Sequence, residues 1–328
     1  MRLQKRTLLV AALALSCAAQ AGTLTGVVVD QGKPLAGAMV TAFSADAKRR
    51  DTVYTDASGR YRLNVDFAGE LTVRARTPYF KDASVKVSLP LPAVKTLDFS
   101  LERHSVAAEL SDSLPASAHA AVLPWGNHNT REAFISQCNY CHQMGNALTR
   151  VPREESRWRD TVRRMEGYFA MLTNREADDI TKALHAGFDG KPVPAVQHQP
   201  WQPQIAPAKI KEWVAGDAAT FIHDTEVGHD DDLYGMDEGH DLIWHLERKT
   251  GKINEYRLPD IDLPEGGVFS GVQLPIGVFN GKHGPHSIAQ AKDGVFWITN
   301  ALSSTLASFD PVSKKMRLFD MGRTHLYP

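Results

Sequence analysis

The run from Gln137 to His142 constrains this chain more than any other stretch, because it contains two cysteines and a histidine at fixed spacing. In the pattern C-x-x-C-H, the thiols of Cys138 and Cys141 are spaced to bond the two vinyl groups of one porphyrin. The imidazole of His142 is then placed to ligate the iron. A zinc site would need a second ligand pair, and a thioredoxin-like redox pair would need a βαβ setting. The sequence therefore predicts one covalently attached haem c per chain.

The N-terminus predicts export. Basic residues precede an apolar run from Leu8 to Leu15, and the small-x-small site Ala19-Gln20-Ala21 follows, which is typical of a signal peptide over residues 1–21. The apolar run is shorter than the about 20 residues that a membrane-spanning helix needs. A lipoprotein modified at Cys17 is the alternative, although Ala14 stands where a lipobox prefers leucine. We expect a periplasmic protein without a membrane span.

The composition narrows the classes of partner. A net charge of -1 and an isoelectric point near 6.9 give no electrostatic reason to expect nucleic acid or an anionic membrane surface. Cleavage of the signal peptide would leave only Cys138 and Cys141, both assigned to haem, so no disulfide framework is expected. A length of 328 residues is enough for two or three domains.

The first predicted domain covers residues 22–102 and is a β-sandwich. Its predicted strands are short, β-branched or alternating, and separated by turn signals: Leu24–Val29, Ala38–Ala42, Arg60–Val65, Leu71–Ala75, Val85–Val87 and Leu97–Leu101. The segment resembles the carboxypeptidase regulatory-like (transthyretin-like) domain, which shares the patterns T-G-x-V, G-K-P-L-x-G-A-x-V and T-D-x-x-G-x-Y. The resemblance implies a structural or adhesive role, and the segment contains no catalytic constellation.

A linker rich in alanine and serine is predicted over residues 103–126, followed by an all-α haem domain over residues 127–190. Three helices are expected: one that Asn129 caps and that ends at Cys138, one over residues 153–169, and one that begins at a capping box of Thr173 and Glu176. The segment resembles a class of short monohaem cytochrome c domains. The shared elements are C-x-x-C-H, a W-x-x-x-V-x-R-M helix and an L-T-x-x-E helix.

The sixth iron ligand is less constrained by the sequence. Met165 is the first choice, because it shares a helical face with Trp158 and Val162 that would pack against the porphyrin. On the same spacing Met165 could instead belong to an ordinary core. Met171 and His185 are the alternatives, whereas Met144 is too close to His142 to reach the opposite side of the iron.

The last predicted segments are a proline-rich spacer over residues 191–208 and an incomplete β-propeller of about two blades over residues 209–328. Two stretches that begin at His223 and His286 share the same pattern of strands and turns, and Ile210–Trp213 resembles the outer strand of a further blade. The pattern D-G-x-x-W-I-T-N and F-D-P-x-x-x-K resembles the virginiamycin B lyase-like propeller family. Closure needs about four to eight blades, so we expect that the sequence is truncated.

Histidines in this last segment suggest a second site. His223 recurs as His286 at the same position of the repeat, so the pair could line a metal or substrate site or could be a repeated structural residue. The acidic run from Asp230 to Asp232 is interpreted as a solvated turn. No catalytic residue of the lyase family can be placed on this chain.

The leading functional hypothesis is an exported monohaem cytochrome c module for single-electron transfer, with Cys138 and Cys141 holding the haem and His142 and Met165 ligating the iron. Its partner would be a redox protein or a dehydrogenase. One alternative places lyase or dehydrogenase activity in the propeller. A second alternative is a protein that binds carbohydrate or peptide through its sandwich and propeller.

Overall fold

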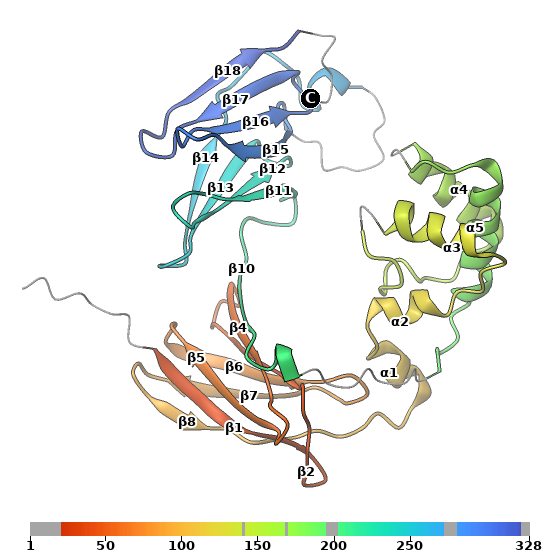
Figure 1. The fold of residues 1–328 in the computed structure, drawn as a ribbon, viewed down its shortest axis with the longest axis vertical. Helices are drawn as coiled ribbons and strands as arrows, with labels where there is room; N and C mark the ends of the chain where they lie inside the picture. Colours follow the sequence, from red (N-terminus) through yellow and green to blue (C-terminus); the bar gives the residue numbers. More distant parts are fainter. Residues whose placement is uncertain (1–20, 140–141, 168–169, 195–202, 272–280, 323–328) are drawn as a thin grey trace, which may run out of the picture. The chain divides into compact units, whose positions relative to one another are not determined.

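A computed structural model describes residues 21–139, 142–167, 170–194, 203–271 and 281–322 (Figure 1). The chain divides into two compact units, and the boundary between them lies after Glu212. All but the last residue of the predicted signal peptide lies outside the described residues. Among the helices that are described, none combines the length and the apolar character needed to cross a membrane.

The first unit begins with two β-sheets. In one sheet, β1 pairs with four strands, antiparallel to β2 and β5 and parallel to β8 and β9; the bounds are β1 Gly22–Asp30, β2 Lys33–Pro34, β5 Arg60–Val65, β8 Val94–Thr96 and β9 Phe99–Ser100. The other sheet has the order β10-β4-β3-β6-β7, with β3 Met39–Phe43, β4 Arg49–Tyr54, β6 Gly69–Arg76, β7 Ala83–Leu89 and β10 Lys209–Trp213.

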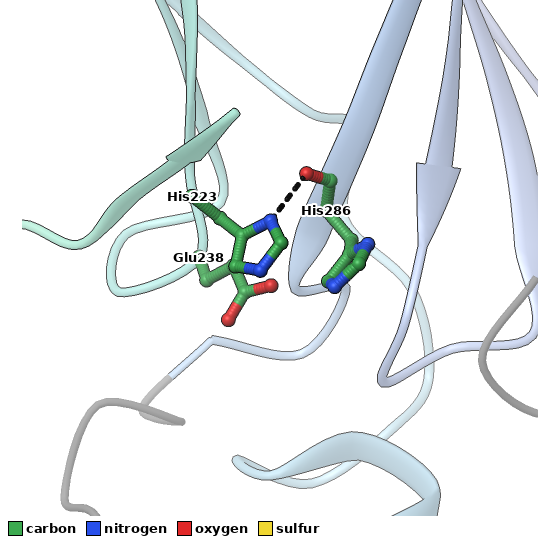
Figure 2. A group of neighbouring side chains, drawn as sticks. All are labelled: His223, Glu238 and His286. Carbon is green, nitrogen blue, oxygen red and sulfur yellow. Dashed lines mark hydrogen bonds between the residues drawn. The ribbon is translucent and has the colours of Figure 1, made fainter. Parts of the chain in front are cut away.

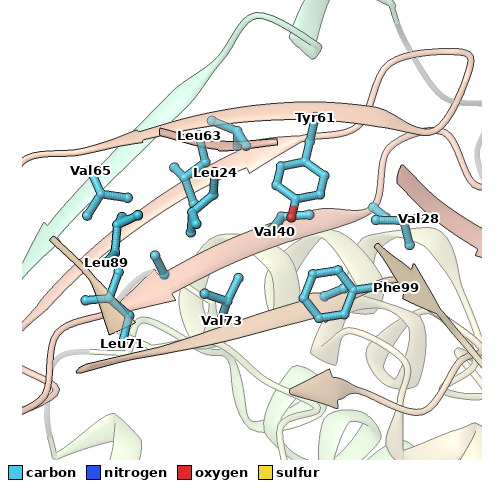
Figure 3. Close-up of a cluster of buried hydrophobic side chains, with 14 of the residues drawn as sticks. Leu24, Val28, Val40, Tyr61, Leu63, Val65, Leu71, Val73, Leu89 and Phe99 are labelled. Atoms are coloured by element: carbon cyan, nitrogen blue, oxygen red, sulfur yellow. The ribbon is translucent and has the colours of Figure 1, made fainter. Parts of the chain in front are cut away.

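One apolar core joins the two sheets, as Figure 3 shows. In β5 exposed and buried residues alternate strictly, so that Tyr61, Leu63 and Val65 point into the core, as the period-2 pattern of the sequence predicts. Val40 on β3 and Val73 on β6 face them from the other sheet and are fully buried. The predicted sandwich-like domain is therefore confirmed.

Gly26 explains the glycine of the T-G-x-V pattern. It lies in β1 where the backbone of Leu97 passes so closely that a β-carbon on Gly26 would stand 1.9 Å from the Leu97 carbonyl oxygen. The Leu97 amide donates to the carbonyl of Thr25, and the Val27 amide donates to Asp98 Oδ1. A side chain at position 26 would separate these two segments.

Two features of this sheet pair differ from the prediction. The strand β4 was not predicted, because its first three residues, Arg49, Arg50 and Asp51, are charged. The segment Ile210–Trp213 was predicted as the outer strand of a propeller blade, but within β10 it pairs with β4 and extends the sandwich sheet. Residues 209–212 thus lie in the first unit rather than at the start of a propeller.

Helices follow the sandwich in the chain. They are α1 Ala107–Asp112, α2 Ala116–Ala121, α3 His128–Ala133, a π-helical turn Phe134–Cys138, α4 Glu155–Glu166 and α5 Asn174–Gly187. The first two lie in the segment that was predicted as a linker, and Leu114, Ala118 and Leu123 there are buried. The linker was predicted from an alanine-rich composition without periodicity, a signal that cannot distinguish short helices from coil.

The helices α3, α4 and α5 pack around a second apolar core. Trp158 and Val162 of α4 and Ile180 and Leu184 of α5 are almost completely buried, as the helical spacing predicts. The capping box at Thr173 and Glu176 is present, whereas the cap of α3 is not the predicted Asn129. Asn127 caps α3 instead, because its Oδ1 accepts the Thr130 amide at 2.9 Å.

The second unit contains two antiparallel four-stranded sheets of matching design. One comprises β11 Ile222–Val227, β12 Leu233–Asp237, β13 Leu242–Glu247 and β14 Lys252–Arg257, and the other comprises β15 Pro285–Gln290, β16 Phe296–Asn300, β17 Thr305–Phe309 and β18 Met316–Asp320. In both sheets each strand pairs with the next one in sequence, which is the arrangement of a propeller blade. Tyr234, Phe296 and Phe309 lie in a third core between the sheets.

Candidate functional site

Cys138 is the described half of the cysteine pair, and it closes the π-helical turn that extends α3. Its side chain is half-buried and packs against the helical core of Trp158, Ile180 and Leu184. Cys141 lies outside the described residues. A π-helical turn aims its side chains away from the regular α-helical stripe and is frequent at functional sites. The fold thus presents the first thiol of C-x-x-C-H to an apolar surface.

The environment of Cys138 is that of a protonated thiol. Burial raises its pKa to about 11. A redox-active C-x-x-C cysteine or a zinc-binding thiolate requires the opposite, a pKa lowered by a positive charge, a helix N-terminus or a metal. Cys138 instead lies at the C-terminal end of its helix. The local electrostatics therefore disfavour a cysteine that exchanges disulfides or binds zinc as a thiolate.

Two side chains with iron-ligating atoms are exposed close to this turn. His142 is exposed, and Met171 is 80% exposed although it is apolar. The Met171 amide donates to Gln137 Oε1 at 2.9 Å, so the segment before α5 is tied to the residue next to Cys138. Met144, in contrast, is buried in the helical core, and its amide donates to Asn139 Oδ1 at 3.2 Å.

The face predicted for the sixth ligand is formed only in part. Trp158 and Val162 are buried as expected, but Met165 is half-buried and does not belong to the helical core. Phe169, the last residue of the helix predicted over residues 153–169, lies outside the described residues. His185 is held in place by the Arg153 carbonyl oxygen, 2.9 Å from its Nδ1.

Trp158 carries a buried donor without an acceptor. Its indole is 1% exposed, and among the described residues no hydrogen-bond partner lies near its Nε1. The Arg153 guanidinium stacks over the ring at 4.8 Å, and the Phe188 ring lies 5.9 Å from it. A buried N–H without a hydrogen bond costs free energy. We therefore expect Trp158 Nε1 to have a hydrogen-bond acceptor other than the described side chains. That this donor is buried and lacks a described acceptor cannot be predicted from the sequence, since burial and hydrogen-bond partners depend on the packing.

A polar hollow of about 380 Å³ lies elsewhere on the helices, where the N-termini of α3 and α5 meet. Asn127, His128 and Arg175 are among the residues that line it. None of the predicted haem residues does, so this hollow contributes nothing to the site at Cys138.

The second unit brings the repeated histidines together. The rings of His223 and His286 stack with their centroids 3.7 Å apart, and Glu238 lies beside them. The repeat singled out both histidines but not Glu238, because the second copy has Ala301 at the corresponding position. At the opposite end of β11, in the turn to β12, the acidic run predicted as a solvated turn forms hydrogen bonds: the Asp232 amide and the Tyr234 hydroxyl both donate to the Asp230 carboxylate.

Comparison with known proteins supports the sandwich directly. The family model of the carboxypeptidase regulatory-like domain matches residues 23–102, which agrees with the resemblance seen in the sequence. No curated protein matches the chain.

Similar solved structures are more distant. Virginiamycin B lyase from Staphylococcus aureus is 16% identical with a TM-score of 0.28, and the match covers 37% of this chain and 33% of that one. A minor pilin from Streptococcus agalactiae is 17% identical with a TM-score of 0.23, covering 26% of this chain and 46% of that one. The chain thus spans about a third of the lyase that it matches, and these weak likenesses carry no argument about activity.

Proposed function

We propose that this chain is an exported c-type cytochrome that transfers single electrons through one covalently bound haem c. The observation that carries the proposal is the C-x-x-C-H run, with the Cys138 thiol facing the apolar helical core. Residues 127–190 would then be a monohaem cytochrome c domain. When bound, the haem supplies reversible one-electron redox chemistry.

The residues present suit such a group. Cys138 and Cys141 would hold it, and His142, exposed as it is, would ligate the iron from one side. The described residues offer no acceptor to the Trp158 N–H, and the carboxylates of a porphyrin are acceptors of the required kind. The apolar side chains of α4 and α5 would exclude water from the bound group, which affects its reduction potential.

For the sixth position we retain Met165, with Met171 as the alternative. Met165 is half-buried on the helix that carries Trp158, and Met171 is an exposed thioether tied through its amide to Gln137. A thioether opposite histidine raises the reduction potential of a haem iron.

The flanking segments fit an exported electron carrier. The signal-like N-terminus and the cysteine count support a periplasmic location. The sandwich would serve as a structural or adhesive domain, and the two blade-like sheets as part of a β-propeller. The electron partner would be another redox protein or a dehydrogenase.

Expression of the full chain with a cytochrome c maturation system tests the proposal. The wild type should show one haem per chain in a pyridine haemochrome spectrum, and the haem should stay attached under denaturing electrophoresis. Cys138→Ala and Cys141→Ala should each weaken the attachment, because each removes one thioether bond. Cys17→Ala is the matched control and should retain full haem, since Cys17 lies in the predicted signal peptide.

The same preparations address the sixth ligand. Met165→Leu should remove the weak charge-transfer band of a thioether–iron bond from the oxidised spectrum, whereas Met171→Leu should leave it. Loss of the band only in Met171→Leu would transfer the role to that residue. Absence of covalent haem from the wild type would overturn the proposed function as a whole.

A further inference from the structure

His223 and His286 occupy the same irregularity in two different strands. The pairing of β11 with β12 shifts register between Ile222 and Asp224, and the pairing of β15 with β16 shifts between Pro285 and Ser287. Each histidine is thus the extra residue of a β-bulge. Bulges re-aim a side chain out of the ladder and are over-represented next to active sites. Such a bulge is present at both histidines, in the first strand of each sheet.

The hydrogen bonding of His223 prepares its ring for a ligand. Its Nδ1 lies 3.0 Å from the carbonyl oxygen of His286, as Figure 2 shows. A carbonyl oxygen can only accept, so Nδ1 carries the proton and Nε2 of the neutral ring keeps its lone pair. A backbone carbonyl that orients a histidine in this way is the usual outer partner of a metal-bound imidazole. The His286 ring stacks on the His223 ring, with the two centroids 3.7 Å apart.

Glu238 contributes a carboxylate of which one oxygen has no hydrogen-bond partner among the described residues. It follows β12 directly and is 1% exposed, and no hydrogen-bond donor in the described part of the chain reaches its Oε1. Asp237 is buried as well, but it accepts from the Phe221 and Gly239 amides and from Trp244 Nε1. The unsatisfied oxygen of Glu238 is therefore not a general feature of this turn.

A second cluster of acidic residues and histidine in the same unit differs from the group with Glu238. Asp230, Asp232 and His245 also lie close together. Their oxygens are already used: Asp230 accepts from the Tyr234 hydroxyl and the Asp232 amide, and Asp232 accepts from His245 Nε2 and the Arg248 amide. That cluster fastens a turn to β13 and needs no ion. Only the group with Glu238 combines convergent donors with a buried unsatisfied carboxylate, among the described residues.

We propose that His223, Glu238 and His286 bind one divalent transition-metal ion of the zinc or iron(II) class. One donor atom from each residue lies within 4.8 Å of the other two. Donors bound at about 2.0–2.2 Å to one ion lie roughly 3–4 Å apart, so side-chain rotations suffice to close the site. Two imidazoles and one carboxylate select such metals over Mg²⁺ or Ca²⁺, which prefer all-oxygen sites. Three protein ligands leave a coordination position open to water or a substrate.

Calorimetric titration of the metal-free full chain with Zn²⁺ tests the proposal. The wild type should bind one ion with high affinity, and Mg²⁺ in excess should not displace it. Glu238→Gln, which keeps shape but removes charge, should weaken binding roughly 10- to 100-fold or more. His229→Asn is the matched control, because His229 is an exposed histidine of the same unit outside the cluster. Its affinity should equal that of the wild type.

Thiolates also bind zinc, so each titration is repeated in a Cys138→Ser, Cys141→Ser background, which makes the result independent of haem attachment. Equal affinity in the wild type and Glu238→Gln, or an equal loss in His229→Asn, would overturn the site. If Glu238→Gln did not fold, His223→Asn would replace it in the titration and should also weaken Zn²⁺ binding. The His223 side chain is exposed, so its replacement leaves the cores intact. Thermal stabilisation by Zn²⁺ in the wild type, absent from the variant, gives a second readout.

Discussion

Asp51 is a charged residue inside the sandwich. It lies on β4 with 4% of its surface exposed, and its Oδ2 has no hydrogen-bond partner among the described residues. Burial raises its pKa from 3.8 to about 6, although the Lys211 ammonium on β10 opposes the shift. The folded state therefore holds a proton that the unfolded state releases at lower pH. The contribution of Asp51 to the free energy of unfolding is therefore greatest below about pH 4 and is lost as the pH rises through 6.

We predict that Asp51→Asn flattens this pH dependence. Between pH 4 and 7, the wild type should lose about 1–3 kcal/mol more unfolding free energy than the variant. Urea denaturation at several pH values measures the difference. Asp66→Asn is the contrasting control: Asp66 pairs with Arg49 and with Lys211 at 2.7 Å, so its loss should destabilise the sheet at pH 7. If the unfolding free energy changed with pH in the same way in Asp51→Asn and in the wild type, the raised pKa of Asp51 would be wrong.

For single residues, the sequence shows which ones repeat, but it does not show which ones become buried or lose their hydrogen-bond partners in the fold. His223 and His286 could be paired because the repeat displays them twice. Glu238 could not, since neither its burial nor its missing partner is visible in a string of letters. The two bulges are equally hidden, because an extra residue in a strand depends on the register of its neighbour.

Among the elements, α5 was predictable because its start is a local signal. The Thr173 hydroxyl accepts the Glu176 amide at 3.3 Å, and Glu176 Oε2 accepts the Thr173 amide at 2.8 Å. We predict that Thr173→Ala destabilises the helix by about 1 kcal/mol, since it leaves a first-turn N–H without its acceptor. Thermal denaturation measures the loss. Thr173→Ser keeps the hydroxyl and should behave like the wild type; an equal loss in both variants would mean that the methyl group matters instead.

The strand β10 shows why other elements were misassigned. Ile210–Trp213 has a strand-like composition, but which strand it pairs with is a non-local choice. It pairs with the charged strand β4, and two ion pairs accompany the pairing: Lys211 with Asp66, which follows β5, and Glu212 with Arg50 of β4. Charges on an edge strand discourage unwanted pairing and also conceal the strand from a hydrophobic pattern. Periodicity therefore predicts that a segment is a strand more reliably than it predicts the partner.

At the scale of the whole molecule, most buried apolar side chains of the described residues belong to one of three clusters, which have no residue in common. They lie in the sandwich, among the helices and between the two blade-like sheets. A domain with its own core can unfold by itself. The boundary after Glu212 separates the third cluster from the other two.

We therefore predict that damage to one core stays local. Phe296 is fully buried between Tyr234 and Phe309, and Phe296→Ala should cost the second unit about 3–5 kcal/mol. Hydrogen exchange followed by mass spectrometry should show lost amide protection in β11 to β18, with β1 to β9 unchanged. Leu24→Ala, which empties a fully buried position of the sandwich, should give the reverse pattern. Lost protection in both units from either variant would show that they unfold as one, because coupled domains cannot lose protection separately.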